Sequence, residues 1–159
     1  MYTPSSELKN FLEKTVTVAG WVNSRRDHGG LIFIDLRDFS GLVQLVVTPE
    51  QADAFSLAES LRDEFVIRAT GKLRLREKDL INPNIPTGDL ELVVESLELL
   101  NRSEPLPVNV HDEGVESGEE LRLKYRFLDL RRPYMQAILK SRSDYYRFLR
   151  NFMYDAGFE

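Results

Sequence analysis

Two short alternating segments, residues 31–37 and 42–47, constrain this chain more than any other feature. In each segment, branched apolar side chains recur at every second position, which predicts a strand with one face in a core. The connection between the segments is short and contains a glycine, which predicts an antiparallel pair. Phe33 and Gln44 fall on the opposite face of this pair. The inward positions are Ile32, Ile34 and Leu36 in the first segment and Val43, Leu45 and Val47 in the second.

The ring of Phe33 and the amide of Gln44 are therefore expected to share one exposed sheet face. A ring that can stack on a base, beside a side chain that can bond a base edge, suits the recognition of single-stranded nucleic acid. The alternative is that a loop or a further domain covers the ring, because single outward aromatic residues are common on proteins.

The composition excludes several classes of function. A chain of 159 residues with 42% hydrophobic content can bury one good core and a piece of a second domain. It has no cysteine and only two histidines, which excludes a Cys/His zinc cluster, and it has no glycine-rich phosphate loop. No apolar run approaches the length of a membrane span and the N-terminus lacks the pattern of a signal peptide, so a cytoplasmic location is expected.

The distribution of charge is more informative than the net charge of -5. Residues 1–100 carry 11 Lys and Arg against 16 Asp and Glu, whereas residues 121–159 carry 9 against 4. An acidic first part argues against a protein that coats nucleic acid by neutralising phosphates. Contacts with nucleic acid are therefore expected to be local and directed at bases.

The residues before the alternating pair predict a helix and a long strand. Residues 6–12 are expected to form a short helix that covers one end of a barrel. In the strand at residues 15–25, Gly20 suits a bulge or sharp coil that lets one strand serve both halves of a curled sheet. Trp21 is assigned to the core. The glycines in the loop at residues 27–30 allow positive φ angles before the next strand.

A second helix and a fourth strand are expected after the alternating pair. Thr48 is the predicted N-cap of a helix that ends near Arg62. The strand at residues 65–76 alternates cleanly, with Leu75 among its inward residues. Its outward side chains are basic. They are either part of a binding surface or an ordinary solvent-exposed face. The basic residues are Arg68, Lys72, Arg74 and Arg76.

A fifth strand at residues 89–100, with Glu91 outward, follows a long loop rich in Pro and Asn. Three strands, a helix and two strands is the order of a mainly β, five-stranded OB-fold Greek-key barrel. Such barrels bind oligonucleotides on the face of strands 2 and 3 and through the loops that join strands 1 to 2 and 4 to 5. The residues in those places are Phe33, Gln44, His28 and Leu80.

Residues 101–120 break the alternating pattern and predict a hinge between two domains. They combine Pro, Gly and a cluster of acidic residues, a composition of low structural propensity. An amphipathic pattern then predicts a long helix at residues 133–156, with Gly157 as its C-terminal stop. A helix of that length has no partner in residues 121–159, so the chain is expected to be a fragment cut inside its second domain.

Several stretches of the chain resemble a known family. GWVNSRRDHGGLIFIDLRDFSGLVQLV, LRLKYRFLDLRRPYM and the helix ending AGFE are similar to the N-terminal part of bacterial-type aspartyl-tRNA synthetases. The barrel half is shared with lysyl- and asparaginyl-tRNA synthetases, which stay as alternatives, whereas RLKYRFLDLRRP is closer to the aspartate branch. The resemblance implies an anticodon-binding OB domain at residues 1–100, a hinge at 101–120 and the start of a class II catalytic domain at 121–159. The last helix would be the motif 1 helix, which builds the family's dimer interface.

The resemblance also implies roles for individual residues. Phe33 is similar to the aromatic residue that stacks on the central anticodon base, and Gln44 and Arg26 are similar to the residues that bond this base. Glu91 aligns with the acidic residue that faces the first anticodon base. A stack is worth about 1 to 3 kcal/mol, and the polar groups supply the choice of base. The loop between the fourth and fifth strands contributes Arg76 and Asn82.

Two positions depart from the pattern of family members that charge only the aspartate tRNA. Such members usually carry Leu where this chain has His28 and Asn where it has Leu80, and members that also charge the asparagine tRNA tend to differ at these sites. The departure predicts a non-discriminating enzyme that charges both tRNAs. Neutral variation of loop residues is the alternative.

The parent enzyme implied by the resemblance is a homodimer that activates aspartate with ATP and Mg²⁺ and transfers it to tRNA. No catalytic residue, metal ligand or cofactor is expected in the part of the enzyme that this chain represents. Two readings of another kind stay open. A stand-alone single-strand-binding OB protein would keep the aromatic face, and a protein-interaction barrel would use Phe33 as an interface residue.

Overall fold

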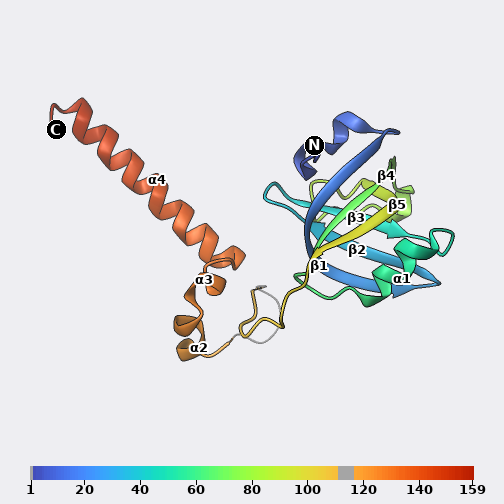
Figure 1. Cartoon of the computed structure of the whole chain (residues 1–159). Coiled ribbons are helices and arrows are strands. Elements are labelled where there is room, and N and C mark those ends of the chain that lie inside the picture. Colours follow the sequence, from blue (N-terminus) through green and yellow to red (C-terminus); the bar gives the residue numbers. More distant parts are fainter. Residues whose placement is uncertain (1, 111–116) are drawn as a thin grey trace. The chain divides into compact units, whose positions relative to one another are not determined.

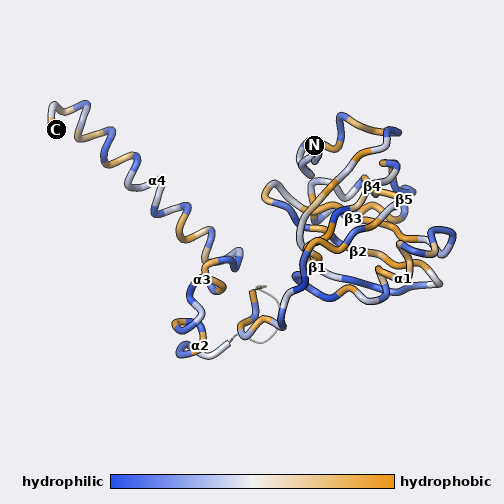
Figure 2. Tube along the Cα trace, viewed as in Figure 1, coloured by the Kyte–Doolittle hydropathy of each residue, from blue (hydrophilic) through white to orange (hydrophobic). Residues whose placement is uncertain are grey.

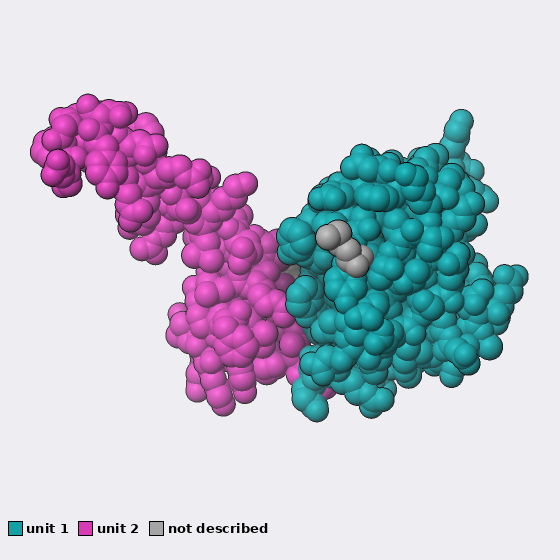
Figure 3. Space-filling model, turned by 45° about the horizontal axis from the view of Figure 1, so that its top comes forward, with its two compact units in different colours: residues 1–104 teal, residues 105–159 magenta. Residues whose placement is uncertain are grey.

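The computed structural model describes residues 2–110 and 117–159. It divides into two compact units, residues 1–104 and 105–159, which Figure 3 colours separately. The first unit is a closed five-stranded barrel (Figure 1), so the predicted mainly β fold with a helix between the third and fourth strands is confirmed. Its strands are β1 (Thr15–His28), β2 (Leu31–Arg37), β3 (Leu42–Val47), β4 (Val66–Leu75) and β5 (Leu90–Asn101). Its helices are the 3-10 helix η1 (Ser5–Phe11), α1 (Ala52–Ser60) and the 3-10 turn η2 (Lys78–Leu80).

The strands follow each other around the barrel in the order β1, β2, β3, β5, β4. All neighbouring pairs are antiparallel except β3 and β5, which run parallel. The helix α1 connects β3 to β4 and packs mainly against β5. Because β3 has a strand on each side and a helix beside it, most of its residues are buried on both faces.

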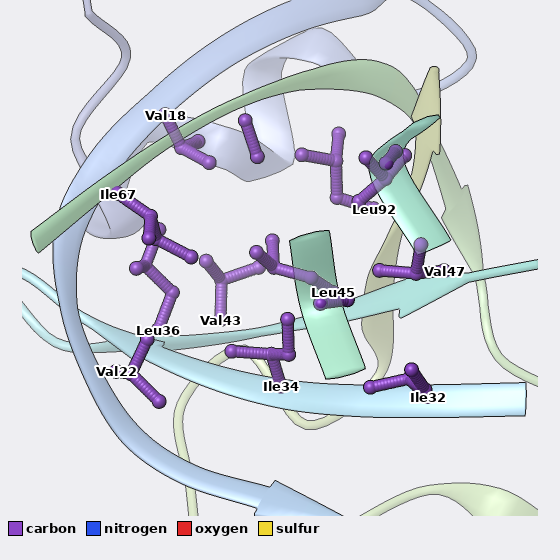
Figure 4. Packing of buried hydrophobic residues seen from close by; sticks show 14 of the residues in the cluster. Val18, Val22, Ile32, Ile34, Leu36, Val43, Leu45, Val47, Ile67 and Leu92 are labelled. Atoms are coloured by element: carbon purple, nitrogen blue, oxygen red, sulfur yellow. The ribbon is translucent and has the colours of Figure 1, made fainter. Parts of the chain in front are cut away.

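The core fills the inside of this barrel. Every inward residue predicted for β2 and β3 is at most 1% exposed. Figure 4 shows their side chains meeting those of β1, β4 and β5 inside the barrel, and Figure 2 shows apolar residues concentrated along the strands. Burial of one such side chain is worth roughly 1.5–3 kcal/mol, so this cluster is the main source of stability for the unit. Its other large members include Leu8, Val18, Val22, Ile67, Leu73, Leu90 and Leu92.

Strand β1 serves both halves of the barrel, as expected. Its first half pairs with β4 and its second half with β2, and Trp21 is the residue at which the two pairings meet. The break in register lies between Val22 and Ser24 rather than at Gly20. Gly20 has a different reason: an added Cβ there would lie 2.2 Å from the carbonyl oxygen of Arg37, so the two backbones approach too closely for a side chain.

The assignment of Trp21 to the core is wrong. Its side chain is 42% exposed. Val18 and Val22 point inward, and strand alternation therefore turns Trp21 to the outer face. The apolar character of the indole ring suggested burial, but its position relative to its neighbours decides the face.

The predicted helix starts need two corrections. The N-terminal helix is a 3-10 helix in which Leu8 is completely buried in the barrel core, and its N-cap residue, Pro4, makes no side-chain cap hydrogen bond. The helix expected to begin at Thr48 begins at Ala52. Residues 48–51 form a separate turn in which the Gln51 N–H donates to the Thr48 carbonyl at 3.2 Å, so Thr48 does not act as the cap.

Alternation in β4 ends two residues earlier than predicted. Leu73 is buried, but Leu75, the last residue of the strand, is 54% exposed. Arg76 was expected to point outward, yet it is 8% exposed. Its Nε donates to the carbonyl of Leu90 at 2.8 Å, so the side chain is outward but enclosed.

The second unit contains α2 (Glu119–Lys124), α3 (Arg126–Asp129) and α4 (Pro133–Asp155). A small apolar cluster holds its first part together and includes Val108, Val110 and Leu128. Helix α4 starts with Pro133 and ends at Asp155, and Gly157, the predicted C-terminal stop, follows with a φ of 84°. None of its side chains is buried. Of the expected hinge, Asn101 belongs to β5, Glu119 and Glu120 belong to α2, and residues 111–116 lie outside the described residues.

Candidate nucleic-acid interface

One cleft of about 570 Å³ brings together all eight residues that the sequence predicted as a site. They come from the end of β1, the middle of β2 and β3, the start of β5 and the loop between β4 and β5. Among the residues that the structure describes, the only additional lining residue is Asp27. The structure therefore groups side chains that are up to 65 positions apart in the sequence. The eight residues are Arg26, His28, Phe33, Gln44, Arg76, Leu80, Asn82 and Glu91.

The β1–β2 hairpin forms one side of the cleft. Strand β1 continues to His28, three residues further than predicted, and only Gly29 and Gly30 make the turn. Their φ angles of 62° and 80° lie in the left-handed region that glycine adopts at little cost. The register pairs Arg26 with Phe33, so the guanidinium and the ring stand next to each other at the start of β2.

The loop from Glu77 to Gly88 forms the opposite side. The N–H of Asn82 donates to the carbonyl of Gly88 at 3.0 Å, and Gly88 has no room for a Cβ beside the Asn82 backbone. The Nη1 of Arg76 lies 3.5 Å from the carbonyl of Leu80. These contacts hold the loop residues Leu80 and Asn82 at the edge of the cleft.

The floor of the cleft is the outer face of the sheet, and it is more enclosed than expected. Gln44 and Glu91 point away from the core, as predicted, but they are only 8% and 6% exposed. Longer side chains contact them: Arg26 reaches Gln44, and Arg74 reaches Glu91. The expected open sheet face is thus a recess, because arginines from the neighbouring strands extend over it.

Hydrogen bonds connect the polar groups of this floor. The Nη2 of Arg26 donates to both oxygens of Asp35, at 3.1 and 3.2 Å, and lies 3.4 Å from the Oε1 of Gln44. The Nε2 of Gln44 lies 3.4 Å from a carboxylate oxygen of Glu91. The other oxygen of Glu91 accepts from Nε of Arg74 at 2.8 Å.

Arg76 is the most enclosed cation of the site. Burial lowers the pKa of its guanidinium, while the carboxylates of Glu91 and Asp35 oppose this effect. A guanidinium stays protonated in proteins, so the cleft contains a fixed positive charge below its surface. Its Nη2 has no hydrogen-bond partner among the described residues, which leaves a donor for a bound molecule or for water.

The charges of the cleft are mixed. Arg26 and Arg76 are balanced by Asp27 and Glu91. Such an arrangement cannot attract phosphates strongly, but it offers directed donors and acceptors beside an aromatic ring. It is therefore suited to the edges of unpaired bases.

Sequence reasoning missed Asp35 and Arg74. Alternation placed Asp35 on the same face as Phe33, and Arg74 was interpreted only as part of a basic edge. Both residues contact predicted site residues. The register of neighbouring strands, which a single sequence does not give, is the information that relates them to the site.

No described residues form a group of three or more His, Cys, Asp or Glu side chains that could hold a metal ion. In the parts of the chain that the structure covers, helices are too short or too polar to cross a membrane.

The fold and the cleft define a class of protein, and comparison with family models identifies it. A model of the OB-fold nucleic acid binding domain matches residues 16–100, and a model of the class II tRNA synthetases (D, K and N) matches residues 118–159. The chain therefore belongs to the family of OB-fold nucleic-acid-binding domains.

The particular relatives are tRNA ligases. An Aspartate--tRNA(Asp/Asn) ligase of Moorella thermoacetica is 50% identical over 145 residues, which are 91% of this chain and 24% of that protein. The predicted resemblance to aspartyl-tRNA synthetases is thereby confirmed. The chain spans about a quarter of the length of this relative.

Solved structures show the same fold. The asparaginyl-tRNA synthetase from Pyrococcus horikoshii complexed with asparaginyl-adenylate is 27% identical with a TM-score of 0.78, over 99% of this chain and 35% of that one. The aspartyl tRNA synthetase from Entamoeba histolytica is 23% identical with a TM-score of 0.80, over 98% of this chain and 38% of that one.

Proposed function

We propose that this chain recognises the anticodon of a tRNA as the N-terminal part of an aspartate--tRNA ligase. Residues 1–100 are the anticodon-binding domain, residues 101–120 a hinge and residues 121–159 the start of the class II catalytic domain. The observation that carries the proposal is the cleft in which Phe33 is surrounded by hydrogen-bonding side chains. The similarity to a ligase over both units supports it.

The order of hydrogen-bonding groups beside Phe33 indicates which base fits there. Arg26 offers a donor, the Oε1 of Gln44 an acceptor and the Nε2 of Gln44 a donor. Uracil presents the complementary order along its Watson-Crick edge, with an N–H between two carbonyl oxygens. Guanine, cytosine and adenine each present a donor where an acceptor is needed, or lack one of the three groups. We therefore assign uracil to the base that stacks on Phe33.

The remaining site residues serve the neighbouring bases in this proposal. Glu91 is an acceptor placed next to Gln44, so it suits a base with exposed amino or imino donors. Arg76 and Asn82 supply donors from the loop side, and His28 and Leu80 lie on the rim of the same cleft. We assign these last two residues to the third base.

For the parent protein we propose the activity of its relatives. It would activate aspartate with ATP and Mg²⁺ and transfer it to tRNA, acting as a homodimer in the cytoplasm. We assign no catalytic residue, metal ligand or cofactor to residues 1–159. The many apolar side chains exposed on α4 support a dimer contact in this region.

Removing the stacking ring tests the proposed function. Phe33→Ala is expected to weaken binding of an aspartate anticodon stem-loop by roughly 5- to 150-fold, since a stack is worth about 1–3 kcal/mol. The measurement is a fluorescence titration of the labelled stem-loop. Phe39→Ala is the matched control, because this phenylalanine is 88% exposed and does not line the cleft.

The outcomes separate the remaining functions. Equal affinity of wild type and Phe33→Ala contradicts the stacking role. Binding of poly-dT as tight as binding of the stem-loop would indicate a sequence-blind single-strand-binding protein. Failure to bind any RNA would favour a protein-interaction barrel, in which Phe33 is an interface residue.

A finer proposal concerns the choice between two tRNAs. His28 and Leu80 differ from the residues usual in enzymes that charge only the aspartate tRNA, and the 50% identical relative is named for both tRNA(Asp) and tRNA(Asn). We therefore expect the parent enzyme to charge both. Aminoacylation assays of the whole protein with the two transcripts test this, and a strong preference for the aspartate tRNA contradicts it.

A further inference from the structure

A row of five polar side chains crosses all five strands of the barrel. Each member is the register partner of the next: Ser24 on β1 with Asp35 on β2, Asp35 with Gln44 on β3, Gln44 with Glu91 on β5, and Glu91 with Arg74 on β4. The row passes beneath the cleft, and Gln44 is its central member. The row lies on the face of the sheet opposite the apolar core.

Hydrogen bonds run along the row from both ends to Gln44. On one side, the hydroxyl of Ser24 donates to Asp35 at 2.7 Å, Asp35 accepts from Arg26, and Arg26 reaches the Oε1 of Gln44. On the other side, Arg74 forms an ion pair of 2.7 Å with Glu91, whose second oxygen faces the Nε2 of Gln44.

The chemistry of these neighbours fixes the orientation of the Gln44 amide. Arginine has donors only, and an ionised glutamate has acceptors only. With the amide turned by 180°, the Oε1 would face the carboxylate of Glu91 and the NH₂ group would face the guanidinium of Arg26. Both contacts would be repulsive in an enclosed site, where polar mismatches cost more than in water. One lone pair of the Oε1 and one N–H of the Nε2 stay available for a base, and their order along the amide is defined.

We propose that Asp35 and Arg74 are positioning residues that hold Gln44 and Arg26 in the orientation that selects the base. Asp35 holds the guanidinium of Arg26 against the Oε1 of Gln44. Arg74 holds the carboxylate of Glu91 against the Nε2 of Gln44. The effect on base selectivity rests on the proposed function. The orientation of the Gln44 amide does not, because it is a property of the protein without RNA.

The chain offers a matched control for Arg74. Arg68 lies on the same strand and forms a cross-strand ion pair of 2.8 Å with Glu98 of β5, as Arg74 does with Glu91. Its pair lies outside the row and outside the cleft. Arg68→Gln therefore removes the same charge and the same kind of contact without disturbing Gln44.

The first measurement uses the protein without RNA. The side-chain NH₂ signals of Gln44 are observed in ¹H–¹⁵N spectra and assigned by comparison with Gln44→Asn. Arg74→Gln and Asp35→Asn are each expected to shift these signals and to increase exchange of the amide protons with water, whereas Arg68→Gln leaves them unchanged. Arg74→Lys, which keeps the charge, is expected to restore much of the wild-type spectrum. Unchanged Gln44 signals in both row variants would overturn the inference.

The second measurement uses four anticodon stem-loops that differ only at the central base. In Arg74→Gln, the ratio between the affinity for the preferred base and the mean of the others is expected to fall about tenfold, the effect of losing one well-oriented hydrogen bond. An equal fall in Arg68→Gln would indicate a general charge effect and contradict positioning. If the wild type shows no preference, the proposed function fails while the spectra of the free protein still decide the orientation of Gln44. Should Arg74→Gln not fold, Asp35→Asn and Arg74→Lys decide the question.

Discussion

At the scale of single residues, the alternation of side chains between the two faces of a strand explains most of the correct predictions. Alternation alone placed Phe33 and Gln44 on the face opposite Ile34 and Leu45, and the structure has them there. The same rule, applied strictly, would have turned Trp21 outward. Arg76 lines the cleft on the outer face, as alternation predicts, but its bond to the backbone of Leu90 leaves it buried.

Asp38 gives a prediction at this scale. Its Oδ1 accepts from the N–H groups of Ser40 and Gly41 and from the Ser40 hydroxyl, and its Oδ2 accepts from the N–H of Ser5. Burial raises the pKa of this carboxyl, but the hydrogen bonds from Ser5 and Ser40 outweigh it and leave the pKa below its usual value.

The sign of the pH effect follows from that depressed pKa. The stabilisation by Asp38 is fully present above the pKa of the unfolded state, near 3.8, and is lost as the pH falls through the lower pKa of the folded state. Asp38→Asn should therefore destabilise the protein by roughly 1–3 kcal/mol at neutral pH and flatten the acid limb of its stability curve. Urea unfolding between pH 2.5 and 7 measures both effects. An acid limb as steep as in the wild type would refute the role of Asp38.

At the scale of elements, the loop between β4 and β5 depends on one side chain. Arg76 bonds to the carbonyl of Leu90 in the barrel and contacts that of Leu80 in the loop. Arg76→Met keeps the aliphatic stem but removes these donors. We expect faster hydrogen exchange at the amides of Asn82 and Leu90, which bond within the loop, and weaker stem-loop binding.

Lys72→Met is the control for this element. Lys72 is on β4 and its ion pair with Glu13 is exposed, so its loss should cost about 0–1 kcal/mol and leave the loop unchanged. Loop exchange that is the same in Arg76→Met and in the wild type would show that backbone contacts alone hold the loop.

At the scale of the whole molecule, the two compact units differ in how they are stabilised. The main apolar cluster lies entirely in residues 1–104, whereas the second unit has a small cluster and a long helix without buried side chains. A chain that ends at residue 104 should therefore fold and bind the anticodon stem-loop within about twofold of the full chain. Thermal unfolding and titration test this, and loss of binding on truncation would show that residues 105–159 contribute to the site.

The sequence by itself determined the barrel, its inward faces and the identity of the side chains on its outer face. These follow from local rules, because alternation, glycine turns and helix stops act over a few residues. The tertiary structure alone decided the register between the strands and the pairing of β3 with β5. That register turned the predicted surface into an enclosed cleft and placed Asp35 and Arg74 in one polar row with Gln44, because strand register depends on contacts between residues far apart in the chain.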